Sequence, residues 1–98
     1  MSLPVVFRPP ARDEYDQAFE WYELRQPGLG LEFEEEVERV LGEVAAHPRR
    51  YPVVLRDIRE APVRRFPYCV YYRGRSGRLI VVSVFHTSRD PNEWQLRT

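Results

Sequence analysis

Two side chains in the second half of the sequence, Arg65 and His86, are of the types that phosphate chemistry needs. If residues 74–77 form the turn of a β-hairpin, Arg73 lies opposite Arg78, and continued pairing places Arg65 opposite His86. An arginine fork binds a phosphate, and a histidine exchanges a proton near neutral pH. This register therefore predicts a pair at the mouth of the sheet that binds a phosphate and moves a proton.

The pairing depends on the turn length, and an alternative stays open. A bulge at Phe66-Pro67 would break the pairing of Arg65 with His86, because side chains alternate strictly between the faces of a strand. A separate alternative is that His86 caps the end of its strand and forms only local hydrogen bonds.

Aromatic residues and arginines are interleaved through residues 51–97. Such a mixture is typical of surfaces on which RNA bases stack. The alternative is an ordinary sheet core with scattered surface arginines. The residues that we single out for target binding are Arg59, Arg64, Tyr68, Arg73 and Trp94.

The charges of the chain are segregated although their formal sum is zero. Residues 1–48 hold eleven acids and four arginines, whereas residues 49–98 hold eleven arginines and four acids. Neutrality argues against a chain held to nucleic acid by bulk charge, but the split predicts a basic face. The alternative is that the two halves simply attract one another.

Several classes of site are excluded or disfavoured by composition. One cysteine excludes an internal disulfide, and two histidines argue against a structural zinc site. The chain has no lysine and no phosphate-loop, dinucleotide or nucleophile-elbow motif, so we expect neither metal nor cofactor. No apolar run approaches the roughly 18 residues of a membrane span, and residues 1–12 lack a secretory apolar region, which predicts a cytoplasmic protein with no membrane partner.

Two helices must follow a short first strand at Leu3–Phe7. Apolar residues at helical spacing predict one helix from about Pro10 to Pro27 and a second that ends near His47. The short linker at residues 26–30 makes the pair an antiparallel hairpin. The two apolar stripes are Ala11, Tyr15, Ala18, Phe19 and Tyr22, then Phe33, Val37, Val40, Leu41 and Val44.

Strand patterns dominate after Pro48. Strands are predicted at 53–55, 58–66, 68–73 and 79–85, and the apolar run 79–85 suits a central strand that is covered on both faces. The predicted fold is a single α+β domain over residues 1–98, with an N-terminal strand and a two-helix hairpin packed on a small, mainly antiparallel sheet.

At these residues the sequence resembles the RelE/ParE toxins of type II toxin–antitoxin modules, also called plasmid stabilisation proteins. The resemblance runs from Val5 to about Trp94, and the family fold is the one already predicted. The segments that carry it are Ala18–Glu23, Pro27–Gly30, Arg65–Tyr68, Val70–Tyr72, Val84–His86 and Arg89–Pro91.

The resemblance implies a protein partner. Toxins of this family are held inactive by a small antitoxin whose C-terminal segment folds along the toxin and masks its working face. Trp21 lies off the apolar stripe of the first helix, so it is our candidate for antitoxin binding. The alternative is that Trp21 packs beside the stripe.

The resemblance leaves the target open between two branches. One branch cleaves mRNA on the ribosome, and in that branch Arg65 and Arg89 would stabilise phosphate charge while His86 acts as general acid or base. The other branch poisons DNA gyrase, inhibits growth and has no hydrolytic site. The whole string resembles the gyrase branch more closely, and a non-toxic interaction module that keeps the fold is the third possibility.

Overall fold

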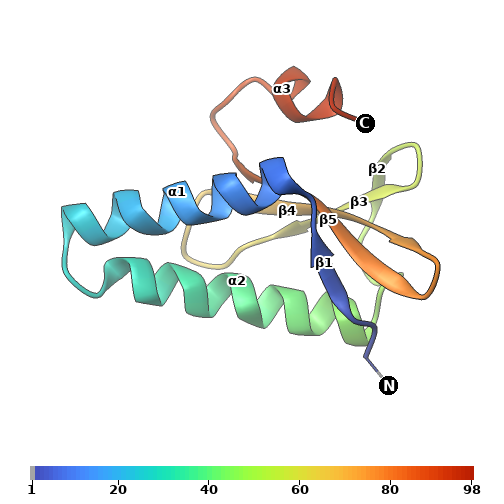
Figure 1. Cartoon of the computed structure of the whole chain (residues 1–98), viewed down its shortest axis with the longest axis horizontal. Coiled ribbons are helices and arrows are strands. Elements are labelled where there is room, and N and C mark those ends of the chain that lie inside the picture. The colour runs from blue at the N-terminus through green and yellow to red at the C-terminus, as the bar shows by residue number, and fades with distance from the viewer. Residues whose placement is uncertain (1) are drawn as a thin grey trace.

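The computed structural model describes residues 2–98 and has the α+β architecture that the sequence predicts. A five-stranded sheet has the order β1-β5-β4-β3-β2, with β1 parallel to β5 and the other neighbours antiparallel. The helices α1 and α2 form a hairpin against the sheet (Figure 1). The elements are β1 (Val5–Phe7), α1 (Pro9–Arg25), α2 (Leu29–Ala46), β2 (Val53–Leu55), β3 (Ile58–Pro62), β4 (Tyr68–Arg75), β5 (Arg78–His86) and α3 (Asn92–Gln95).

Glycines allow the sharp turn and the close contact of the helical hairpin. Gly28 has φ 90°, a left-handed conformation that glycine adopts without steric cost, and α2 begins at the next residue. The Glu23 carboxylate accepts the backbone N–H groups of Gly28 and Leu31, each at 3.2 Å. A Cβ on Gly30 would lie 2.5 Å from the Phe19 carbonyl oxygen. The two helices can therefore pack this closely only because residue 30 has no side chain.

The main core lies between the helical hairpin and one face of the sheet. Tyr22 of α1 and Phe33 of α2 form a tilted pair, and the Phe66 and Tyr68 rings stand edge-on to both. Except for Phe19, the residues of the two apolar stripes predicted for the helices belong to this core. Burial of these faces is the main force that holds the helices on the sheet.

The opposite face of the sheet is covered by the chain end, which the sequence did not reveal. The Trp94 indole of α3 is 1% exposed and stacks on Tyr71 with ring centroids 4.0 Å apart. α3 thus lies across the sheet from α2 (Figure 1). The central strand β5 is covered on both faces, as predicted, but Trp94 is a core residue and has no surface to offer a target.

The β4–β5 hairpin differs from the predicted register. Its loop is only Ser76 and Gly77, both with positive φ (53° and 71°), so Arg75 rather than Arg73 lies opposite Arg78. This is the conformation of a tight hairpin turn whose twist matches that of the strands. Further along, a bulge shifts the register between Tyr71 and Tyr72, and Phe85 therefore faces Trp94 rather than the helices.

The predicted pairing of Arg65 with His86 is therefore wrong. The third strand ends at Pro62 instead of Phe66, and the backbone then turns, with Arg65 at φ 69°. His86 lies opposite Tyr68. None of the helices within residues 2–98 is both long and apolar enough to cross a membrane.

Candidate functional groove

A groove of about 550 Å³ runs between α1 and the ends of β4 and β5. Apolar and aromatic groups dominate its wall, and the polar groups come from α1, β4, β5 and the segment after β5. We call it the α1–β5 groove. Its lining residues are Glu14, Gln17, Ala18, Trp21, Tyr22, Pro67, Tyr68, Val84, His86, Ser88 and Arg89.

The groove lies where the first strand stops covering the edge of β5. β1 pairs with β5 only over Leu79–Val81, so the edge from Val82 onward faces α1. There the Glu14 carboxylate of α1 accepts the Ser83 hydroxyl at 2.8 Å and the Val84 N–H at 3.2 Å. A side chain thus replaces the missing strand partner at this part of the edge.

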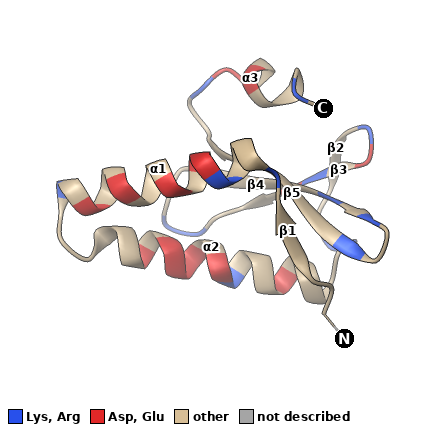
Figure 2. Cartoon of the chain, in the orientation of Figure 1, with Lys and Arg blue, Asp and Glu red and all other residues tan. Residues whose placement is uncertain are grey.

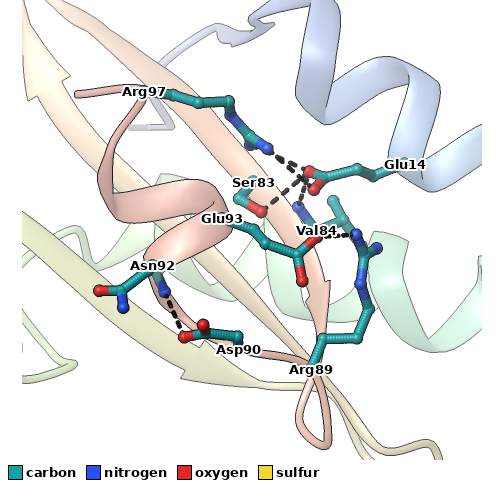
Figure 3. Close-up of polar contacts among 8 residues, drawn as sticks. All are labelled: Glu14, Ser83, Val84, Arg89, Asp90, Asn92, Glu93 and Arg97. Atoms are coloured by element: carbon teal, nitrogen blue, oxygen red, sulfur yellow. Dashed lines mark hydrogen bonds and ion pairs between the residues drawn. The ribbon is translucent and has the colours of Figure 1, made fainter.

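Glu14 is also neutralised by Arg97 of the chain end (Figure 3). The Arg97 guanidinium donates to both Glu14 carboxylate oxygens, at 3.1 and 3.2 Å, and to the Val82 carbonyl at 2.9 Å. Bidentate pairing of this kind fixes the orientation of the carboxylate and also balances its charge. Glu14 is therefore a structural group at the side of the groove and is not available as a base.

His86 has a defined tautomer in this groove. The Ser88 backbone N–H donates to His86 Nδ1 at 3.1 Å, and the Ser88 hydroxyl lies 2.8 Å from the same nitrogen. Because a backbone N–H can only donate, Nδ1 accepts, and the neutral imidazole carries its proton on Nε2. The ring stands edge-on to Tyr68, 5.0 Å away between centroids.

Tyr68 and Arg89 supply the remaining polar chemistry. Burial raises the pKa of the Tyr68 phenol, nearby Tyr22 adds to the shift, and Arg89 opposes it. The phenol therefore stays neutral at physiological pH. Arg89 pairs with Glu93 and lies over the Phe85 ring, 5.0 Å from its centroid. The groove thus holds an imidazole, a neutral phenol and one guanidinium.

Trp21 lies at the groove with half of its surface exposed (50%). The Arg25 guanidinium sits 4.1 Å from the centre of the indole ring, within the range of a cation–π contact. Trp21 lies off the buried stripe, and its ring packs edge-on against buried Tyr22 with the centroids 5.1 Å apart, so the half-exposed indole lies beside the stripe.

Arg65 is held elsewhere. Its guanidinium donates to Glu32 of α2 at 2.7 Å and lies 3.7 Å from Glu36. The Glu32 hydrogen bond is the main cause that raises the pKa of Arg65. Of the three residues proposed for catalysis, the structure brings His86 and Arg89 to one groove and leaves Arg65 out of its lining.

The residues singled out for target binding do not form one surface. Arg59 donates to the Tyr51 carbonyl at 2.7 Å, and Arg73 pairs with Asp57 at 2.8 Å, so both have structural partners. Arg64 is exposed and Tyr68 lines the groove.

Sequence reasoning missed Glu14, although a signal was present. Glu14 follows Ala11 by three positions and precedes Ala18 by four, so it falls on the apolar stripe of the first helix. A carboxylate on a buried stripe needs partners. Ser83 and Arg97, which supply them, lie far along the chain and carry no such signal.

A helical hairpin on a mainly antiparallel sheet is the architecture of small α+β toxins expected from the resemblance, and comparisons with known proteins agree. Residues 5–91 match the family described as the ParE toxin of type II toxin–antitoxin system, parDE, and the chain belongs to this family. Among solved structures it is similar to a chain described as "Chromosomal ParDE TA system from P. aeruginosa". That match has a TM-score of 0.77 and 11% identity, and it covers 89% of this chain and 98% of the other. No curated protein matches the sequence.

Proposed function

We propose that this ParE-family toxin inhibits growth by poisoning DNA gyrase in the cytoplasm. The match to ParE toxins over residues 5–91 carries the proposal. Further support comes from Arg65, which pairs with Glu32 instead of facing His86, so the predicted phosphate-binding pair is not assembled. An apolar groove whose one acid is neutralised suits binding to a protein better than hydrolysis.

A ribosome-dependent ribonuclease is the second candidate, and one observation favours it. His86, Tyr68 and Arg89 line the same groove. In that reading the ribose 2′-oxygen attacks the phosphorus and loses its proton to water, the bond from phosphorus to the 5′-oxygen breaks, and His86 Nε2 donates a proton to that leaving oxygen while Arg89 binds the phosphate. Such a role needs Arg89 to exchange its contact with Glu93 for the substrate.

The two candidates are separated by assaying one variant in two systems. With purified gyrase, ATP and relaxed plasmid, we expect loss of supercoiling and accumulation of cleaved DNA, and His86→Gln should retain both effects. With translating ribosomes, we expect no codon-phased mRNA cuts from either protein. Cuts that disappear in His86→Gln would refute the gyrase proposal, and activity in neither assay would favour a non-toxic module.

We further propose that a cognate antitoxin covers the α1–β5 groove and contacts Trp21. The half-exposed indole beside a largely apolar groove supports this, because interface anchors are enriched in tryptophan. Trp21→Ala should weaken binding of the antitoxin encoded beside this gene by at least tenfold, about 1.4 kcal/mol. Leu96→Ala is the matched control, since Leu96 is also exposed (86%) but lies in the chain end. Equal affinities of the two variants would exclude Trp21 from the interface.

A further inference from the structure

A turn between α2 and β2 presents unpaired positive charge. His47, Arg49 and Arg50 are exposed, and together with Pro48 they line a shallow depression. Exposed Arg64 comes from the segment between β3 and β4; burial raises the pKa of the Tyr51 phenol, and the nearby charges of Arg50 and Arg64 both oppose that rise. We call these residues the basic turn. Figure 2 shows the acidic residues concentrated on α1 and α2, and the turn that holds Arg49 and Arg50 follows directly after α2.

The backbone of the basic turn is held from the sheet. The hydroxyl of Tyr72, a fully buried residue of β4 (1% exposed), donates to the Pro48 carbonyl at 3.0 Å. Arg59 of β3 donates to the Tyr51 carbonyl at 2.7 Å and more weakly to the Arg49 carbonyl at 3.4 Å. These hydrogen bonds hold the backbone of the turn. The side chains of Arg49 and Arg50 take no part in them and are exposed.

The charges of this surface are free to meet a ligand. Seven arginines of the described chain pair with carboxylates: Arg12, Arg39, Arg65, Arg73, Arg75, Arg89 and Arg97. Within residues 2–98, the guanidinium groups of Arg49, Arg50 and Arg64 make no ion pair or hydrogen bond. The nearby acid Glu43 accepts the Tyr51 hydroxyl at 2.7 Å.

Local stabilisation of α2 explains only part of this arrangement. Positive charge beyond a helix C-terminus offsets the helix dipole, which is worth about 0.3–1 kcal/mol and fades within a turn. Throughout the described residues, however, none of these guanidinium groups hydrogen-bonds a carbonyl of α2. Arg64 also comes from beyond β3, far from α2 in sequence. The surface is better explained by an external anion.

We propose that the basic turn binds the phosphodiester backbone of duplex DNA. Two unpaired arginines on a fixed turn, with Arg64 from the segment after β3, suit phosphates, which guanidinium groups bind through paired hydrogen bonds. The surface lacks a stacking platform for single-stranded bases, since Tyr51 is tied to Glu43 and packs against the core. Contacts to phosphates alone give binding that ignores sequence. The acidic helices are repelled by DNA, which orients the protein on it.

The experiment measures binding of the full chain to a fluorescein-labelled duplex of about 20 base pairs by anisotropy over a series of NaCl concentrations. Each phosphate contact contributes about 0.9 to the slope of log K against log salt. Arg49→Ala/Arg50→Ala should therefore lower the slope by about 1.8. Arg12→Ala/Arg39→Ala is the control, because it removes the same charge from the acidic helices.

Three outcomes overturn the proposal. One is no detectable binding of the unmodified chain at low salt, and another is an equal loss of slope in both double variants. The third is tighter binding of a single-stranded RNA or of poly-glutamate than of the duplex, which would assign the surface to another partner. Unfolding curves check that both variants stay folded, and because the assay contains no gyrase and no antitoxin, its failure leaves the proposed function untouched.

Discussion

Two glycines of α2, Gly30 and Gly42, should respond in opposite directions to the same change. An ideal Cβ at Gly30 would lie 2.5 Å from the Phe19 carbonyl oxygen and 2.5 Å from the Glu23 Cγ. A backbone oxygen cannot rotate away, so α1 and α2 must move apart. Overpacking of this kind costs about 1–3 kcal/mol. At Gly42 a Cβ meets nothing within 4 Å, and alanine in an open helix position gains about 1 kcal/mol.

The measurement is the free energy of unfolding in urea, followed by far-ultraviolet circular dichroism, for the unmodified chain and the two Gly→Ala variants. We expect Gly30→Ala below and Gly42→Ala above the unmodified protein, with a difference of about 2–4 kcal/mol between them. This is a large share of the roughly 5–15 kcal/mol that holds a domain together. If Gly30→Ala is as stable as Gly42→Ala, the close contact of the two helices at Phe19 is wrong.

Three further predictions concern the sheet and its cover. Trp94→Ala should destabilise the fold by about 3–5 kcal/mol, because it empties a buried site stacked on Tyr71. Trp94→Phe should cost far less in the same urea assay, because it keeps an aromatic ring and removes an indole N–H that is buried without a hydrogen-bond partner. Burial raises the pKa of the Cys69 thiol from 9.0 to about 11. Folding therefore favours the protonated thiol, and this contribution is complete below pH 9 and is lost as the pH rises through 11. Unfolding curves of the unmodified chain should accordingly fall more steeply over this range than those of Cys69→Ala. Tyr72→Phe keeps the buried ring but removes the hydrogen bond to the Pro48 carbonyl, so it should weaken duplex binding several-fold at unchanged net charge. An unchanged affinity would show that this hydrogen bond is not needed to hold the basic turn for binding.

The segregation of charge has a mixed structural basis. Among the ion pairs of residues 2–98, only those of Arg65, with Glu32 and Glu36, and of Arg97, with Glu14, join the acidic half of the chain to the basic half. The remaining ion pairs lie within one half. Attraction between the halves therefore involves only two arginines of the basic half; its other arginines either pair with acids of the same half, as Arg73, Arg75 and Arg89 do, or have no ion pair, as in the basic turn.

The elements of the fold follow from the sequence because their signals are local. Apolar spacing places the inward faces of α1 and α2, and the left-handed Gly28 marks the start of the second helix. The apolar run of β5 identifies the central strand. The ParE resemblance rests on these same local segments, and the family match confirms it.

The arrangement of the groove residues depends on contacts between residues that are far apart in the sequence. Rules based on residue spacing cannot predict such contacts. A loop of only Ser76 and Gly77 and a bulge beside Tyr71 set the hairpin register, so His86 meets Tyr68 instead of Arg65. The register of two strands is set by all the contacts along the pair, and one bulge changes which residues are paired at every later position.

The sequence also carries no local signal for the cover of the second sheet face or for the pairing of the polar groups at the side of the groove. Trp94 is buried only because the chain end folds back over Tyr71. The charge of the Glu14 carboxylate is balanced only because Arg97, near the other end of the chain, pairs with it. Sequence patterns determine which elements form and which faces they bury, whereas tertiary packing decides which polar side chains remain free to bind, because each charge is satisfied by whatever group the fold brings beside it.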